Sequence, residues 1–319
     1  MYTFTLELVS FKILVCIICY SNLRITMNEM IKQHLLFVIN PCSGEGCSNW
    51  EERILACLDI NQYRLTFFTL SKNIQYHNLE DEINKEQPNI VIAVGGDGTI
   101  RFVAACLLNK NIPLGIIPAG SANGLAMELG IIKDLKQSLN TAITGFKKMI
   151  HVLELNKQIC IHLSDIGLNA HAMRTFEVQQ QRGFWGYFLA SLKVFWKSRK
   201  IKAVLKFNDQ IVSAKAELIV IANCTKYGTG ALINPIGVLN DTKFEIIVVK
   251  TISILEIFKM VFSHTNFDPN KIEVFQTSQI LISSKRKVHF QIDGEYLGKL
   301  KEIQVNIIPN ALTIMVPFE

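Results

Sequence analysis

Several familiar functional signatures are missing from this sequence of 319 residues, and each absence argues against a class of protein. The sequence contains neither GxxxxGK followed by Ser or Thr nor GxGxxG, two well-known phosphate-binding fingerprints. No histidine pair has the HExxH spacing of a zinc enzyme, and no GxSxG segment supplies the nucleophile of a hydrolase triad. Lys and Arg do not alternate with aromatic residues along any one stretch, so we expect no nucleic-acid partner.

Charge and cysteine are also scarce. Charged residues make up 19% of the chain and apolar residues 49%, which is typical of a globular protein without a disordered tail. The net charge of +6 suits an anionic partner such as a nucleotide or an acidic membrane surface. The 8 cysteines are too sparse for a disulfide scaffold, and most lie in apolar runs. They predict reduced, buried thiols and a cytoplasmic protein.

The N-terminal stretch offers little that could anchor the chain in a membrane. Ile13 to Tyr20 is apolar, but it is too short to span a bilayer, and Glu7 and Lys12 interrupt the residues around it. Neither a positive cluster nor a small-residue cleavage site marks a signal peptide. We therefore expect residues 1–29 to be a dispensable extension, or the result of a start codon misplaced ahead of Met27.

The most informative stretch runs from Val91 to Leu108. An apolar, β-branched run ends in the segment GGDGT, and an apolar pattern of helical spacing follows it directly. Glycines let an anion approach the backbone closely, and the first amides of a helix are unpaired and electropositive, so phosphate is the expected ligand. The alternative is an ordinary strand-to-helix turn with a threonine N-cap, and the loop alone does not decide between them.

The sequence around this stretch alternates between strands and helices. Apolar runs at His34–Ile39, Tyr63–Leu70 and Leu114–Ile117 predict further strands, and amphipathic segments predict helices between them, one opening with a capping box at Ser48 and one near Ser71–Lys85. This alternation predicts an α/β domain over residues 30–145, with a parallel sheet and helices on both faces. Ligands of such sheets bind outside the carboxyl ends of the strands, where three glycine-bearing loops fall.

After about Gly145 the pattern changes to short strands joined by turn pairs such as Asn156-Lys157 and Asn208-Asp209. Such a density of strands predicts a mainly antiparallel β-sandwich over residues 146–319, with a final strand able to return to the first domain. Helical stretches at Trp185–Trp196 and Ile254–Phe262 interrupt it. The aromatic run Gly183–Trp196 favours a helix covering the sandwich over a lipid contact.

The segment Asp293-Gly294-Glu295 follows a predicted strand and has two interpretations. Asp-Gly between apolar runs is a common hairpin turn. If the backbone were extended instead, Asp293 and Glu295 would point the same way and could accept a hydroxyl proton or hold a cation.

Taken together, these motifs resemble the lipid kinase family that carries the diacylglycerol kinase catalytic domain and also includes sphingosine and ceramide kinases. The resemblance extends from about residue 34 to the C-terminus. The matching motifs occur in the family's order: Asn40-Pro41-x-Ser43-Gly44-x-Gly46, Gly95-Gly96-Asp97-Gly98-Thr99, Pro118-Ala119-Gly120-Ser121-Ala122-Asn123, Arg182-Gly183-x-x-Gly186-Tyr187, Gly228-x-Gly230, Pro235 with Asp241, and Asp293-Gly294-Glu295.

The resemblance implies phosphorylation of a lipid hydroxyl by ATP with Mg²⁺ in a cleft between two domains, at a membrane surface. It implies that Asp293 and Glu295 act in acid-base catalysis and that Asp97 assists magnesium or the acceptor hydroxyl. It also implies that Asp241 belongs to a separate, structural magnesium site. The residues that it places at the nucleotide are Asn40, Ser43, Gly44, Gly46, Thr69, Gly95, Gly96, Asp97, Gly98, Thr99, Ser121 and Asn123. Because edge strands of a sandwich often pair between subunits, a homodimer is also a possible assembly.

Four positions depart from the family pattern. Family members usually have Glu where Phe102 stands, Thr where Ser121 stands, Asp where Gly124 stands, and Gly where Thr242 stands. Phe102 lies off the apolar stripe of its helix, which suggests that a ring replaces a carboxylate facing the cleft. Two rival functions therefore remain: a nucleotide- or lipid-binding protein that has lost catalysis, and an NAD kinase-like enzyme, which would share the GGDGT segment.

Overall fold

The structure is a computed structural model that describes residues 32–43, 49–71, 75–167, 200–227, 231–234, 237, 241–251, 256, 259 and 267–318. The predicted extension at residues 1–29 lies outside these residues. So do Gly44 and Gly46, the aromatic run Gly183–Trp196, the pair Gly228 and Gly230, and most of the predicted helix Ile254–Phe262.

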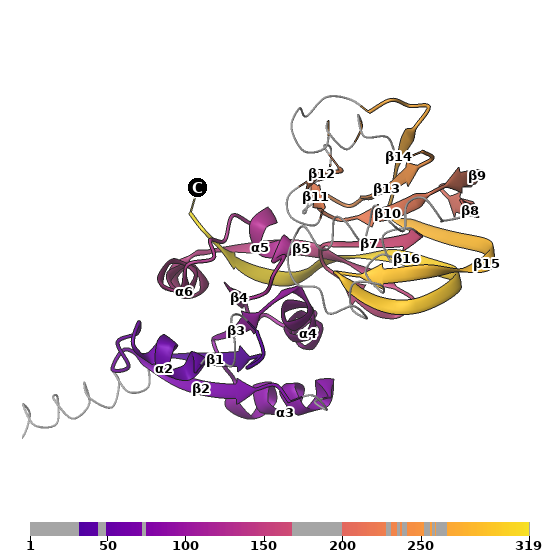
Figure 1. The fold of residues 1–319 in the computed structure, drawn as a ribbon. Coiled ribbons are helices and arrows are strands. Elements are labelled where there is room, and N and C mark those ends of the chain that lie inside the picture. The colour runs from indigo at the N-terminus through magenta and orange to yellow at the C-terminus, as the bar shows by residue number, and fades with distance from the viewer. Residues whose placement is uncertain are drawn as a thin grey trace, which may run out of the picture.

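The N-terminal domain is built on four parallel strands in the order β2-β1-β3-β4 (Figure 1). The strands are β1 (Gln33–Ile39), β2 (Tyr63–Thr69), β3 (Ile90–Gly95) and β4 (Leu114–Pro118). The helices are α2 (Trp50–Leu55), α3 (Tyr76–Glu86), α4 (Asp97–Leu107), α5 (Gly124–Glu128) and α6 (Leu135–Thr144).

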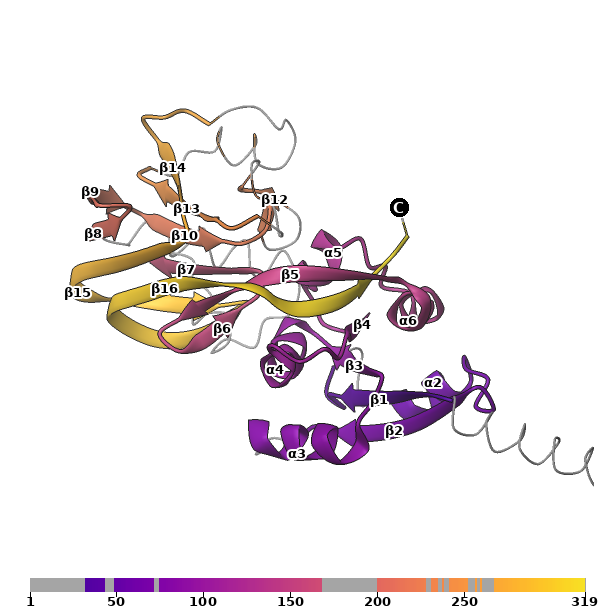
Figure 2. The same cartoon turned by 180° about the vertical axis from the view of Figure 1, so that it is seen from behind.

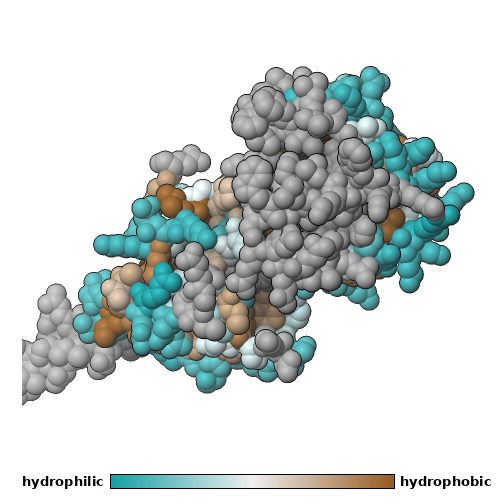
Figure 3. Space-filling model, viewed as in Figure 1, coloured by the Kyte–Doolittle hydropathy of each residue, from teal (hydrophilic) through white to brown (hydrophobic). Residues whose placement is uncertain are grey.

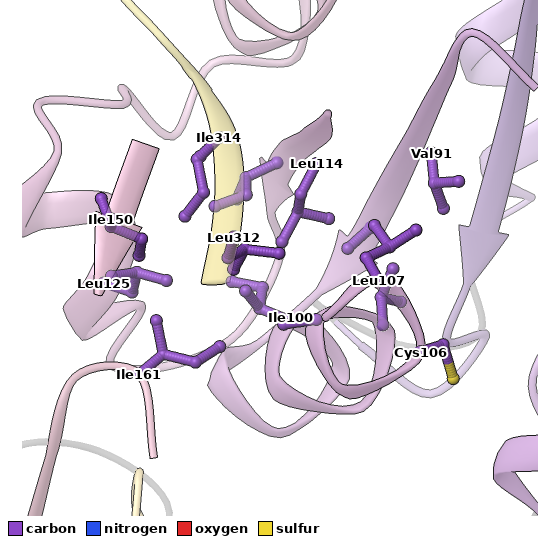
Figure 4. Packing of buried hydrophobic residues seen from close by; sticks show 14 of the residues in the cluster. Val91, Ile100, Cys106, Leu107, Leu114, Leu125, Ile150, Ile161, Leu312 and Ile314 are labelled. Atoms are coloured by element: carbon purple, nitrogen blue, oxygen red, sulfur yellow. The ribbon is translucent and has the colours of Figure 1, made fainter. Parts of the chain in front are cut away.

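Both faces of this sheet are covered by helices because side chains alternate along each strand. On β1, Leu36 joins a cluster with residues of α3 and α4, whereas Leu35 joins a cluster with residues of α2 and α6. Figure 4 shows part of the first cluster, in which Ile100 and Leu107 of α4 lie near Leu114. The predicted α/β fold with helices on both faces is confirmed.

The C-terminal domain is antiparallel, as predicted. Its strands are β5 (Phe146–Leu155), β6 (Gln158–Cys160), β7 (Leu163–Gly167), β8 (Ile201–Phe207), β9 (Gln210–Ala216), β10 (Leu218–Ala222), β11 (Lys226–Tyr227), β12 (Ala231–Leu232), β13 (Phe244–Val249), β14 (Ile272–Thr277) and β15 (Gln279–Ile292). Buried residues of β5, β7, β8, β10, β13 and β15 share one core. The turns Asn156-Lys157 and Asn208-Asp209 are two-residue hairpins with positive φ at all four residues, which confirms both turn predictions.

The last strand, β16 (Glu295–Val316), runs through both domains (Figures 1 and 2). It begins as the hairpin partner of β15, continues beside β5, and reaches β4, where Ile314 pairs in parallel with Leu114. Fourteen of the described strands thereby form one continuous sheet. The two domains therefore share a hydrogen-bonded backbone connection as well as their covalent one.

Some local details differ from the sequence expectations. In α2 the N-cap is Asn49 rather than Ser48, and its side chain accepts a hydrogen bond from the Glu52 backbone. The helix expected from about Ser71 begins at Tyr76, and α6 was not anticipated. Of the cysteines in the described residues, Cys106, Cys160 and Cys224 are buried, and Cys42 and Cys57 are exposed.

Within the described ranges, no helix is long and apolar enough to cross a membrane. Hydrophilic residues cover most of the visible described surface at the end of the molecule where β8 and β9 lie (Figure 3).

Candidate active site

Two loops that the sequence analysis singled out meet where the strand order reverses. Asn40 follows β1, and its backbone N–H donates to the carbonyl of Val94 on β3 at 3.0 Å. Its side-chain Nδ2 donates to Oγ1 of Thr99, in the first turn of α4, at 3.2 Å. Because β2 lies on one side of β1 and β3 on the other, this is a topological switch point, where sheets of this class bind ligands.

The two glycine-bearing loops after β3 and β4 touch through their backbones. A Cβ on Gly96 would lie 3.1 Å from the Cα of Gly120, and a Cβ on Gly120 would lie 2.5 Å from the Cα of Gly96. Side chains at these positions would push the loops apart. At Gly98, by contrast, a Cβ would meet no atom of the described residues within 4 Å, so this part of the chain leaves open the space beside the first turn of α4.

Other residues predicted at the nucleotide have structural roles that the contacts define. Asn123 has a φ of 51° and closes its own loop: Oδ1 accepts from the Gly120 N–H at 2.8 Å, and Nδ2 donates to the Gly120 carbonyl at 2.9 Å. Ser43 is buried, and its carbonyl accepts from the indole of Trp50. Ser121 is exposed on the loop after β4, and Thr69 is exposed at the end of β2, opposite Ile39.

Asp97 stands at the start of α4 and holds the start of α5. Its Oδ2 accepts from the backbone N–H of Gly124 at 3.1 Å, and its Oδ1 accepts from that of Leu125 at 3.3 Å. Burial raises the pKa of Asp97, and the nearby charge of Asp293 raises it further. The two amide hydrogen bonds and the charge of His162 act in the opposite direction. Asp97 therefore belongs to one electrostatic cluster with residues of the β domain.

Asp293 and Gly294 form a two-residue hairpin turn between β15 and β16, with φ of 46° and 84°. The extended backbone that would have aligned Asp293 with Glu295 is therefore absent, and that interpretation is corrected. The carboxylate of Asp293 is buried and turns inward. Its Oδ2 accepts from the N–H of Ile161 at 2.9 Å, and its Oδ1 accepts from the next two backbone amides at 2.9 and 3.1 Å.

Glu295 turns the other way and forms an ion pair with Arg101 of α4. The Arg101 side chain is only 9% exposed and that of Glu295 is 54% exposed, so the pair joins a buried cation to an accessible carboxylate. Arg101 was not among the predicted site residues. A signal was present, because Arg101 is the only charged residue in the apolar run from Ile100 to Leu108.

His162 was also missed, although it is the only strongly polar residue in the run from Ile159 to Leu163. It is buried between β6 and β7, and its backbone N–H donates to Asp293. Its ring lies against Gly124, where a Cβ would come within 2.9 Å of the imidazole Cε1. The His162 imidazole thus occupies the space that a side chain at residue 124 would need.

Phe102 does not replace a carboxylate that faces the site. Its ring stacks on Tyr76 of α3, with centroids 4.7 Å apart and planes 16° apart, and packs against the α/β core. The expectation that this ring faces the cleft is therefore wrong, because residue 102 lies on the α3 side of α4.

Asp241 lies just before β13, where its Oδ1 accepts from the backbone N–H of Lys243. It is close enough to Glu245 for its charge to add to the effect of burial, which raises the pKa of Glu245. Among the described residues, no cluster of three or more His, Cys, Asp or Glu side chains is arranged to hold a metal ion.

Comparison with protein families gives two matches that together span most of the chain. Residues 34–155 match the model described as diacylglycerol kinase catalytic domain. Residues 164–316 match the model described as YegS C-terminal NAD kinase beta sandwich-like domain.

Related proteins have corresponding names. The diacylglycerol kinase of Bacillus subtilis is 24% identical over 237 residues, which cover 71% of this chain and 78% of that protein. An Escherichia coli protein named "Probable lipid kinase YegS" is 28% identical over 244 residues, covering 74% and 81% of the two chains. A crystal structure of a diacylglycerol kinase from Bacillus anthracis matches with a TM-score of 0.68 and 18% identity, covering 89% of this chain and 97% of that one. It therefore has the same fold.

Proposed function

This chain belongs to the lipid kinase family that carries the diacylglycerol kinase catalytic domain, and we propose that it transfers the terminal phosphoryl group of ATP to a hydroxyl of a diacylglycerol-like or sphingoid lipid. One observation carries the proposal. The segment after β3 contacts both the loop after β1 and the loop after β4 at the switch point of the sheet, and the charge of Asp293, in the β-domain turn, acts on Asp97 at that point. Phosphoryl transfer needs such a combination of phosphate-binding backbone and nearby carboxylates.

The nucleotide phosphates would bind over the first turn of α4. The N-terminal amides of this helix favour an anion, and the open space beside Gly98 lets a phosphate approach them. Asn40 and Asn123 would act by shaping the loops, since their side chains are engaged with Thr99 and Gly120. The further residues that we propose for nucleotide binding are Ser43, Gly44, Gly46, Thr69, Gly95, Gly96, Asp97, Thr99 and Ser121.

A magnesium ion fits Asp97 by the chemistry of the donors. Magnesium commonly binds one or two carboxylates, with phosphate and water oxygens completing its six ligands, so a cluster of three protein ligands is not required. Each carboxylate oxygen of Asp97 accepts one backbone hydrogen bond and keeps lone-pair capacity. A cation held there would neutralise charge on the transferred phosphoryl group.

We propose that Glu295 accepts the proton of the acceptor hydroxyl. Its carboxylate is accessible, whereas the Asp293 oxygens already accept backbone hydrogen bonds from Ile161 to Leu163. Asp293 would then act by fixing the turn from which Glu295 projects, and Arg101 would orient the Glu295 carboxylate. The two acidic residues of this turn thus divide acid-base work and positioning between them.

A second, structural cation near Asp241 is also part of the proposal. Asn234 contributes a buried Oδ1 that has no partner within the described residues, and the carboxylates of Asp241 and Glu245 lie nearby. An oxygen-rich set of this kind suits magnesium.

The lipid acceptor would be met at a membrane surface from the cytoplasmic side, where the net charge of +6 favours anionic headgroups. A homodimer through the sheet edges at β2 or β14 belongs to the same proposal.

The test is transfer of labelled phosphate from ATP, with magnesium, to dioleoylglycerol, sphingosine or phosphatidylglycerol in mixed micelles. NAD in solution is a separate acceptor. We expect one lipid to become labelled, and both Asp97→Ala and Glu295→Gln to lower the rate by at least about 100-fold. Asp81→Asn, at an exposed position on α3, is the matched control and should behave like the wild type.

Labelled NAD would overturn the lipid assignment. No labelled acceptor, with ATP still bound, would indicate a binding protein that has lost catalysis.

A further inference from the structure

His162 is a buried side chain with a ring nitrogen that no described residue hydrogen-bonds. The residue is 6% exposed and lies in the turn between β6 and β7. Its Nε2 is enclosed and has no hydrogen-bond partner in the part of the chain that the structure describes. Buried polar atoms nearly always have a partner, so an enclosed nitrogen without one points to a position that a ligand can satisfy.

The fold makes room for this imidazole at Gly124. A Cβ at residue 124 would lie 2.9 Å from Cε1 and 3.1 Å from Nδ1 of His162, so any larger residue would displace the ring. The backbone N–H of Gly124 is also one of the two that hold Asp97. Glycine therefore lets the imidazole pack directly beside the segment that fixes the Asp97 carboxylate.

The same residue is fixed on its other side by the β domain. The backbone N–H of His162 donates to Oδ1 of Asp293 at 2.9 Å, and its carbonyl accepts from the N–H of Asn223 at 3.2 Å. The charges of His162 and Asp293 both act on the pKa of Asp97. His162 thus contacts both sides of the site: its imidazole packs against Gly124, which holds Asp97, and its backbone N–H holds the Asp293 carboxylate.

This placement favours the phosphate acceptor over the donor as the ligand of Nε2. The proposed nucleotide loops follow β1, β3 and β4. His162 instead belongs to the β domain, and its backbone N–H donates a hydrogen bond to Asp293, in the turn that precedes Glu295. In phosphoryl transfer the attacking oxygen lies opposite the leaving oxygen, roughly in line. Groups supplied from the β domain are therefore on the acceptor side.

We propose that His162 is a positioning residue for the acceptor, and that its Nε2 forms a hydrogen bond with the lipid hydroxyl that receives the phosphate. The inference rests on the proposed function and adds a specific contact to it. A hydrogen bond at this point would hold the hydroxyl oxygen between Asp97 and Glu295 while its proton is removed.

The first test compares His162→Phe, which keeps a ring and removes both nitrogens, with His162→Gln, which keeps a hydrogen-bonding group. The acceptor is the lipid that the wild-type protein labels best in the micelle panel. We expect His162→Phe to lower kcat/KM for the lipid by at least about tenfold, with an unchanged KM for ATP, and His162→Gln to recover part of the loss.

His151→Phe is the matched control. His151 is a second buried histidine, whose Nδ1 accepts from the backbone N–H of Asn310 rather than lying beside a site carboxylate. This variant should lower the thermal midpoint without changing kcat/KM for the lipid in the protein that remains folded.

The second test uses the contact with Gly124. We expect Gly124→Ala to lower lipid kcat/KM in the presence of His162, because the added methyl displaces the ring, and to cost nothing further in a His162→Ala background. Additive losses would overturn the inference.

The outcomes separate the inference from the function beneath it. A wild-type protein that labels no lipid would remove the proposed function itself. An active wild type with His162→Phe of equal kcat/KM would leave the function standing and overturn the role of His162. A His162→Phe variant that changes only the KM for ATP would also overturn the acceptor assignment.

Discussion

Arg101 and Glu295 connect the two domains at the level of single side chains. Arg101 is buried, and within the described part of the chain its guanidinium has the Glu295 carboxylate as its ion-pair partner. The Glu295 side chain is 54% exposed, and it is the proton acceptor that we propose for the lipid hydroxyl. Replacing Glu295 therefore removes the proposed proton acceptor and also leaves the buried Arg101 guanidinium without this ion-pair partner. For this reason the loss of activity in Glu295→Gln must be measured beside the thermal midpoint of the same variant.

Asp97 gives a prediction about stability and pH. Its pKa is raised mainly by burial, so the ionised carboxylate is less favourable in the folded protein than in the unfolded chain. This cost is present near pH 7 and fades as the pH falls through the raised pKa. We expect Asp97→Asn to raise the thermal midpoint near pH 7 and to lose activity by at least about 100-fold. The gain in midpoint should shrink as the pH is lowered to about 4.

Thermal unfolding of both proteins at several pH values measures this difference, with Asp81→Asn as the exposed control. A lower midpoint for Asp97→Asn near pH 7 would show that the hydrogen bonds from Gly124 and Leu125 to the ionised carboxylate outweigh its desolvation.

At the scale of elements, α3 and α4 are held together partly by the stacked rings of Tyr76 and Phe102. Phe102→Glu would restore the residue usual in the family, but it would place a carboxylate against an aromatic face. We expect the variant to lower the free energy of unfolding by about 1–2 kcal/mol and to leave lipid phosphorylation near the wild-type rate.

Urea unfolding and the micelle assay measure the two effects of Phe102→Glu. Phe102→Leu, which keeps apolar contact, is the control and should lose less stability. A clear rise in activity for Phe102→Glu would contradict the geometry, because it would mean that residue 102 acts at the site.

The elements that could be predicted from sequence are those encoded locally. The β3–α4 unit follows from an apolar strand, glycines and a helical apolar period, and the Asn208-Asp209 hairpin follows from residues that tolerate positive φ. The Asp293-Gly294 turn follows from an Asp-Gly pair between apolar runs, and that interpretation is confirmed. The partners of Asp293 and Glu295 could not be predicted, because they are distant in the sequence.

The contacts that complete the candidate site are long-range. Arg101 and Glu295 are 194 positions apart, and Asp293 reaches amides about 130 positions away. Nothing in the local pattern around Arg101 specifies its partner. The two side chains meet because the start of β16 lies against α4 in the folded chain. Sequence motifs therefore identified most of the candidate residues, but not which of them touch.

At the scale of the whole molecule, β16 makes the two domains parts of one sheet. Its hairpin end carries Glu295 and its far end reaches β4 beside the α/β core. Ile314 is fully buried there, in the same core cluster as Leu114 and Ile150 (Figure 4). We therefore expect a destabilising substitution at this end of β16 to destabilise the other end as well, because β16 pairs with β5 and β15 along its length.

We expect Ile314→Ala to lower the free energy of unfolding by about 2–4 kcal/mol, because it leaves a cavity in the shared core. Since the sheet is continuous, the loss should accelerate hydrogen exchange of peptides from β3 and from β10 to a similar extent. Ile211→Ala, at a position 71% exposed on β9, is the control and should change stability by less than about 0.5 kcal/mol. Faster exchange in β3 with none in β10 would show that the domains unfold independently and that β16 does not couple them.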